Sequence, residues 1–155
     1  MIYNCTDIED ISRIINNPKI YKWISDDLSP EVYTPVINSA ILYLMNKEKT
    51  GVIQITPMNG VTGQVHTSVS SELWGKSAEF VKEATQWLFS NTRYLKVIAF
   101  IPTYNRLTIK LAADCGMKKE GLIEKSFLKN WKLWNQEIWG LAKEEAICQQ
   151  RRQQQ

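Results

Sequence analysis

Residues 69–77 read Val-Ser-Ser-Glu-Leu-Trp-Gly-Lys-Ser and come directly after the apolar segment 61–69. That segment is typical of a strand, and helical spacing of apolar residues begins at Ser77. Free backbone N–H groups at the start of such a helix bind phosphates well. Gly75 lets the backbone approach a pyrophosphate, Lys76 adds a positive charge, and the Ser77 hydroxyl can cap the helix. The stretch predicts a phosphate site, although Gly-Lys-Ser also occurs as a plain turn and cap.

A second strand and helix follow this first pair. Residues 96–101 are dense in Val, Ile and Phe, and Pro102 ends the strand because proline cannot donate to a ladder. Since a helical crossover precedes it, this strand is expected to run parallel to the strand that ends at Val69. Asn105 then opens the helical segment 106–115, which stops at Gly116.

The rest of the chain reads as further strands and helices around these two units. The expected elements are a short edge strand at 1–4, a helix started by the capping box Thr6–Glu9, a short second helix near 18–28, strands at 41–45 and 52–56, and a hairpin of 120–127 with 137–141. No repeat or linker marks a boundary. We therefore predict a single domain over residues 1–143 and a polar, flexible tail over residues 144–155.

Composition limits the class of protein. The 155 residues, 44% of them hydrophobic, suffice for one good core. No stretch approaches the roughly 20 apolar residues that cross a bilayer, and residues 1–10 lack a basic start followed by an apolar run. The net charge of +3 is too small to argue for nucleic acid by itself. We expect a cytoplasmic protein with no membrane partner.

Cysteine and histidine are sparse. Cys5, Cys115 and Cys148 are scattered, and His66 is the only histidine. These residues do not have metal-ligand spacing, so no metal site is predicted. The cysteines are expected to be ordinary reduced thiols.

The order of elements, with Gly75 before the long helix and Asn105 before the next, resembles the GCN5-related N-acetyltransferase (GNAT) family over nearly the whole chain. The matching stretches are Trp87-Leu-Phe, Asn105 through Gly116-Met117, and Glu120-Gly121-Leu122. The ribosomal-protein N-acetyltransferase-like branch, which acetylates protein N-termini and amine-bearing small molecules, is the most similar. The resemblance implies an α/β (α+β) fold: a central mixed, mostly antiparallel twisted sheet of about seven strands, flanked by about four helices.

The same resemblance implies an acyl-CoA-dependent N-acyltransferase. Such an enzyme transfers acetyl from acetyl-CoA to an amine by direct attack in a ternary complex. The residues that would bind acetyl-CoA are Thr67, Val69, Trp74, Gly75, Lys76, Ser77 and Asn105. Backbone groups of Thr67 and Val69 would bond the pantetheine arm between two splayed strands.

Two residues are candidates for catalysis. His66 stands where the family often places its general base, and its ordinary pKa suits removal of a proton from an ammonium; a strand histidine without a catalytic role is the alternative. Ala112 stands where family members commonly have a tyrosine that protonates the leaving thiolate. Tyr104 is a candidate substitute for that acid, and packing is its alternative role.

The acceptor is expected to be a small-molecule amine or a protein N-terminus. Aromatic residues that could form its pocket are Tyr21, Trp23, Tyr33, Trp131 and Trp134. Tryptophans in a hairpin are more often part of the core.

A competing interpretation starts from the residues that depart from the family pattern, Glu72, Ser77 and Ala112. It is a catalytically inactive GNAT-fold binding or assembly protein. Small proteins of similar appearance act in head and virion assembly of bacteriophages, which would place this one in the host cytoplasm or the virion. Its protein partner would bind the region Phe127 to Trp134. The last strand could also pair with a second copy to give a homodimer, and nucleic-acid binding ranks last.

Overall fold

Seven strands and five α-helices make up the structure, a computed structural model that describes residues 1–155. The strands are β1 (Ile2–Asn4), β2 (Leu42–Asn46), β3 (Gly51–Pro57), β4 (Thr62–Val69), β5 (Lys96–Pro102), β6 (Lys118–Lys129) and β7 (Lys132–Ala142). The helices are α1 (Ile8–Ile15), α2 (Pro18–Ile24), α3 (Ser77–Asn91), α4 (Arg106–Asp114) and α5 (Lys143–Gln153), with a short 3-10 helix, η1 (Ser71–Leu73), before α3. None of the helices combines the length and the apolar composition needed to cross a membrane.

All seven strands belong to one sheet, in the order β1-β2-β3-β4-β5-β7-β6. β4 and β5 are parallel, and every other neighbouring pair is antiparallel. The predicted mixed, mostly antiparallel sheet is therefore confirmed, as is the parallel crossover through α3. The structure has one helix more than the four or so expected, because the polar tail forms α5.

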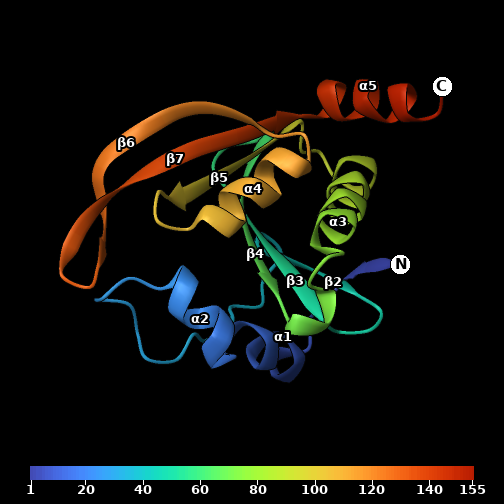
Figure 1. Cartoon of the computed structure of the whole chain (residues 1–155). Helices are drawn as coiled ribbons and strands as arrows, with labels where there is room; N and C mark the ends of the chain where they lie inside the picture. Colours follow the sequence, from blue (N-terminus) through green and yellow to red (C-terminus); the bar gives the residue numbers. More distant parts are fainter.

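The helices cover the two faces of the sheet (Figure 1). α3 and α4 pack on one face, where Leu88 and Cys115 join a cluster of buried side chains that includes Leu44 and Val97. α1 and α2 pack on the other face around Tyr43. Each buried core thus uses alternate residues of the same strands, as the two-residue period of a strand requires.

β4 and β5 diverge soon after they meet. Their ladder runs only from Thr62↔Lys96 to Gln64↔Ile98. Both strands continue because each keeps a partner on its outer edge: β3 pairs with β4 as far as Val69, and β7 pairs with β5 as far as Pro102. The result is a V-shaped opening in the middle of the sheet, visible in Figure 1 where β5 leaves β4.

Two helix starts differ from the predicted ones. The cap of α1 is Asp7 rather than Thr6, because the Asp7 carboxylate accepts from the backbone N–H groups of Glu9 and Asp10. α3 has no side-chain cap: Lys76 occupies the cap position, and the Ser77 hydroxyl donates to the Leu73 carbonyl, 3.1 Å away. The prediction that Ser77 caps this helix was wrong. The first N–H groups of α3 are left open as a consequence.

α5 extends from the end of β7 and forms most of the tail. Gln149 Nε2 donates to the Gly116 carbonyl, 3.0 Å away, and Lys118 lies 3.5 Å from Glu145. These contacts tie the first two turns of the helix to the domain. The flexibility expected of residues 144–155 stays a prediction, since a tethered helix can still move as a unit.

Replacing Ile11 by Ala is expected to destabilise the protein by about 2–5 kcal/mol. The Ile11 side chain is fully buried between α1 and the sheet, so its truncation leaves a cavity. Ile8, on the same helix, is 50% exposed and provides the matched control. Ile8→Ala should cost less than about 0.5 kcal/mol. Urea unfolding of both variants tests this, and equal losses would contradict the packing described for α1.

Candidate active site

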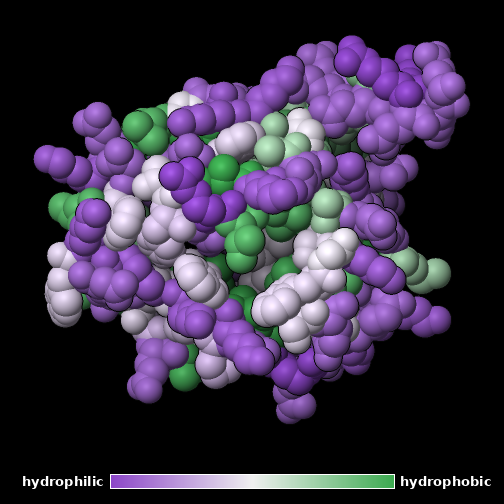
Figure 2. Space-filling view, viewed as in Figure 1, coloured by the Kyte–Doolittle hydropathy of each residue, from purple (hydrophilic) through white to green (hydrophobic).

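A cavity of about 130 Å³ occupies the V between β4 and β5. On one face of the sheet its walls come from α3 and α4, and on the other face from α2, β6 and β7. Figure 2 shows a hollow in the middle of the molecule with hydrophobic residues inside it and hydrophilic residues at its rim. The cavity therefore passes through the sheet and joins its two faces.

His66 lines this cavity from β4. Val65 and Val69 pack against the core under α3, so the alternation of the strand places His66 on the face of α2. Gln64 Nε2 lies 3.0 Å from His66 Nε2. The His66 ring keeps an exposed edge, but the walls of the cleft displace water around it and lower its pKa. A lowered pKa keeps the imidazole neutral, and hence able to accept a proton, at neutral pH.

The backbone of β4 faces the V without a partner beyond residue 64. The Val61 carbonyl accepts from Lys96 N of β5, 3.2 Å away, whereas the Thr62 carbonyl accepts from the turn after β3. Since peptide groups alternate along a strand, Thr67 and Val69 point the same way as Val61, toward β5. The β4–β5 ladder has already ended there. Thr67 also lines the cavity.

Asn105 holds α4 against the V. Its side chain is buried, and its Oδ1 accepts from the Thr108 backbone N–H at 3.2 Å, which confirms it as the cap of the helix. This cap sets the rotation of α4 that brings Thr108 and Ala112 to the cavity wall. Gly116 ends the helix with a φ of +82°, a conformation that favours glycine.

The four residues of the turn 74–77 lie at the edge of the V and are not part of the cavity wall. Gly75 has a φ of +87°, and a side chain added there would meet no atom within 4 Å. The backbone is thus open to a ligand at Gly75, beside the uncapped start of α3 and the exposed Lys76. Open N–H groups with a lysine fit a phosphate.

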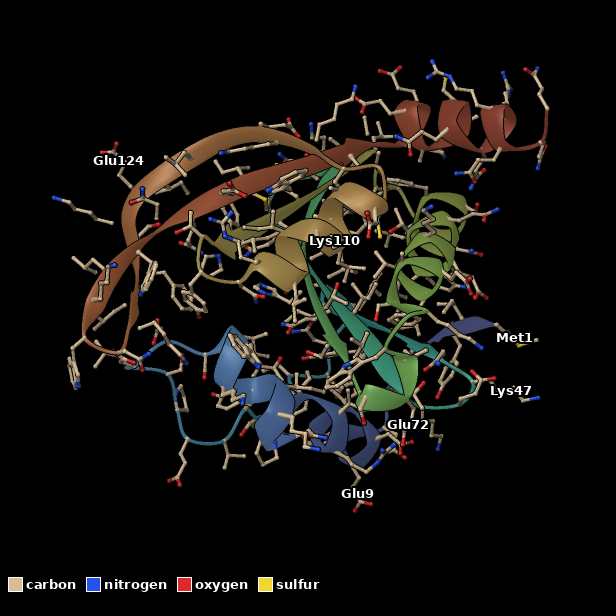
Figure 3. All side chains as sticks on the ribbon, in the orientation of Figure 1. Met1, Glu9, Lys47, Glu72, Lys110 and Glu124 are labelled. Carbon is tan, nitrogen blue, oxygen red and sulfur yellow. The ribbon has the colours of Figure 1, made fainter.

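Two carboxylates lie close to this turn, and their negative charge repels an anion bound there. Glu79 belongs to the first turn of α3 and is exposed. Glu72 accepts a hydrogen bond from the Ser70 hydroxyl. Figure 3 shows Glu72 at the edge of the molecule on the side of α1, whereas Lys110 of α4 lies at the front. The hydrogen bond from Ser70 gives Glu72 a local partner, and the negative charge of Glu72 remains beside the turn.

Tyr104 lies outside the cavity, in an aromatic cluster beneath α2. Its ring centre is 5.3 Å from that of Trp134 and 6.1 Å from that of Phe127, and its hydroxyl donates to the Trp23 carbonyl at 3.3 Å. Burial, with a smaller contribution from Asp27, raises the pKa of Tyr104 to about 12. These contacts favour the packing role that the sequence left open.

Cys115 lines the cavity, although no role was predicted for it. Burial raises the pKa of its thiol to about 11, and Sγ lies 3.8 Å from the Ala78 carbonyl. A thiol with so high a pKa is almost entirely protonated at neutral pH. Because only the thiolate is a strong nucleophile, Cys115 is poorly suited to covalent catalysis.

The wall on the α2 side includes residues that the sequence reasoning missed. Gln136 and Phe127 reach it because Gln136 pairs with Pro102 across the β5–β7 ladder and Phe127 lies on the neighbouring β6. No local motif marks either residue. Of the aromatic residues proposed for an acceptor pocket, Trp23 lines the cavity, whereas the Trp131 side chain is 80% exposed at the hairpin tip.

The segment Phe127 to Trp134 is hydrogen-bonded to the loop after α2. Both Asp27 carboxylate oxygens accept from the hairpin tip, one from Asn130 N and one from Trp131 N. Lys129 Nζ donates to the Ser25 carbonyl at 2.7 Å. The hairpin tip is thereby fastened to the loop that follows Trp23 and Ile24, two residues of the cavity wall.

Solved structures that superpose on this chain include spermidine N-acetyltransferases. A spermidine N-acetyltransferase from Vibrio cholerae, in complex with CoA and spermine, superposes with a TM-score of 0.78 at 14% identity, covering 95% of this chain and 97% of that one. A mutant form of the spermidine/spermine N-acetyltransferase SpeG from the same organism gives 0.76 at 14% identity, with 97% of both chains covered. No protein-family model and no curated protein matches the sequence.

These likenesses define the fold. The seven-stranded mixed sheet, split between β4 and β5 and flanked by helices, is the GNAT fold. The fold expected from Gly75 and Asn105 is therefore confirmed. The comparisons give no support to a bacteriophage origin or to the ribosomal-protein branch.

Proposed function

We propose that the protein is an acyl-CoA-dependent N-acyltransferase that acetylates a small-molecule amine. One observation carries the proposal: the cavity in the V joins the open backbone of β4 to His66 on the other face of the sheet. A thioester entering from the α3 side and an amine entering from the α2 side would meet there. The structural neighbour that binds CoA and spermine adds support.

The turn 74–77 and the V would hold acetyl-CoA. The open N–H groups at the start of α3, with Gly75 and Lys76, suit the pyrophosphate. The free peptide groups of Thr67 and Val69 suit the amide groups of the pantetheine arm, as a further strand would. Asn105 acts indirectly, by fixing α4 as the opposite wall.

His66 would accept the proton that the ammonium form of the amine must lose. Its lowered pKa keeps it neutral and available at the pH where the reaction runs. The free amine then attacks the acyl carbon to form a tetrahedral intermediate, and its collapse breaks the carbon–sulfur bond; the remaining surplus proton on nitrogen is lost to water, and water protonates the thiolate. A backbone N–H near Val69 would stabilise the negative charge on the acyl oxygen.

Direct attack by the amine suits the groups present better than an acyl-enzyme does. Cys115, the cavity's only thiol, is held protonated by burial. The departing thiolate also needs less help than an alkoxide would, because thiols are comparatively acidic; the cysteine thiol, for example, has a pKa of about 8.5. The absence of a tyrosine at Ala112 is therefore compatible with turnover, with water protonating the thiolate and Tyr104 serving as a packing residue.

A thiol-release assay tests this function. Purified protein with acetyl-CoA and a panel of primary amines should release CoA thiol only when an amine is present. Mass spectrometry should find the acetylated amine in an amount equal to the thiol. Release of thiol without an amide product would indicate hydrolysis, and no release with any amine would favour the catalytically inactive binding protein.

A further inference from the structure

The part of the cavity on the α2 side contains no charged residue. Its aromatic walls are Trp23, Phe100 and Phe127, and its polar groups are Gln64, His66 and Gln136. The remainder of the cavity lining likewise includes no Asp, Glu, Lys or Arg. An acceptor bound here therefore meets flat apolar surfaces and uncharged hydrogen-bonding groups.

Two carboxylates in the loop after α2, those of Asp26 and Asp27, already accept hydrogen bonds within the chain. Asp26 Oδ1 accepts from Leu28 N at 2.9 Å and from the Ser29 hydroxyl at 3.0 Å. Asp27 uses both of its oxygens on the hairpin tip, at 3.0 and 2.7 Å. A ligand ammonium would compete with the turn 26–29 for Asp26 and with the hairpin tip for Asp27.

Lysines surround the aromatic rings on this side. Lys22 Nζ lies 5.4 Å from the Trp23 ring centre, and Lys132 Nζ lies 4.0 Å from that of Trp134. Lys129 Nζ donates to the backbone carbonyls of Lys22 and Ser25. Of the rings in the cavity wall, that of Trp23 thus already carries a cation, and the added positive charge repels another.

We propose that the acceptor is a monoamine with a flat apolar body, not a polyamine. This inference rests on the acyltransferase function proposed above and names its substrate class. A second ammonium on the substrate would lie in an uncharged, partly desolvated site without a carboxylate partner, which is costly. An aromatic monoamine instead places its ring against the apolar walls formed by Trp23, Phe100 and Phe127 and leaves one uncharged group for Gln64 or Gln136. The spermidine acetyltransferases that share the fold would differ in this respect.

The test compares phenethylamine and tyramine with spermidine and spermine in the thiol-release assay. The monoamines should have the higher kcat/KM, by about tenfold or more, because an unpaired cation is costly in such a site. Gln136→Glu places a carboxylate in the cavity and should shift the preference toward spermidine. Gln150→Glu, the same change on α5 away from the cavity, should not.

Binding of acetyl-CoA, measured separately by calorimetry, distinguishes the two possible failures. If acetyl-CoA does not bind, the proposed function fails and the acceptor class fails with it. If acetyl-CoA binds and spermidine or spermine is acetylated as well as the aromatic monoamines, only the acceptor class is overturned. Bound acetyl-CoA with no turnover of either monoamine would also overturn it.

Discussion

Thr108→Trp is expected to abolish detectable binding of acetyl-CoA. Thr108 lies on the first turn of α4, and its side chain forms part of the cavity wall opposite β4. An indole at this position would fill the space through which the pantetheine arm must pass. The cap on α4 is retained, because Asn105 accepts from the Thr108 backbone N–H and not from its side chain.

Leu107→Trp is the matched control, since it adds an indole one residue earlier on the same helix. The Leu107 side chain is 80% exposed and points to solvent. Calorimetric titration with acetyl-CoA should show wild-type binding for Leu107→Trp and none for Thr108→Trp, with thermal melts confirming that both are folded. Equal affinities for the two variants would mean that acetyl-CoA does not pass α4.

His66→Asn is expected to lower kcat by about 10²–10⁴, the usual contribution of a general base. Affinity for acetyl-CoA should change little, because His66 lies on the face of the sheet away from α3. The acidic limb of the pH profile of kcat/KM should lie below pH 6.5 in the wild type, since burial lowers the pKa of His66. That limb should vanish in the variant, and an unchanged limb and rate would assign proton removal to water.

The same histidine makes the stability of the protein depend on pH. The pKa of His66 is lower in the folded state than in the unfolded chain, where it is about 6.5. The unfolded state therefore binds more protons, and the contribution of His66 to stability is lost as the pH falls from 6.5 through the folded pKa. Urea unfolding between pH 7 and 5 should show a smaller loss in His66→Asn.

The sequence reveals the parts of the fold that depend on local signals. The predicted elements confirmed in this way are the strand that ends at Val69, the uninterrupted helix 77–91, the cap at Asn105 and the stop at Gly116. Local signals fail to predict the capping residue where two neighbouring side chains can accept from the same backbone N–H groups. Asp7 replaces Thr6 as a cap because a carboxylate one residue later reaches two N–H groups.

The acceptor side of the site depends on contacts between distant segments. Gln136 reaches the cavity through strand pairing with Pro102, and Phe127 reaches it through the curvature of the β6–β7 hairpin. The hairpin is held in place by Asp27, about 100 residues earlier in the chain. Residue spacing within one segment carries no information on such contacts. His66, which lines the cavity, could be singled out from the sequence because it is the only histidine and lies on the strand before the turn 74–77.

Titration of the wild-type protein with acetyl-CoA in a calorimeter tests whether the split between β4 and β5 is an acyl-CoA site. We predict saturable binding of one acetyl-CoA per chain with micromolar affinity, weakened by Lys76→Glu but not by Lys47→Glu. Lys47 is exposed in the β2–β3 turn and provides the matched control. If no binding is measurable at millimolar acetyl-CoA, the split between β4 and β5 is not an acyl-CoA site.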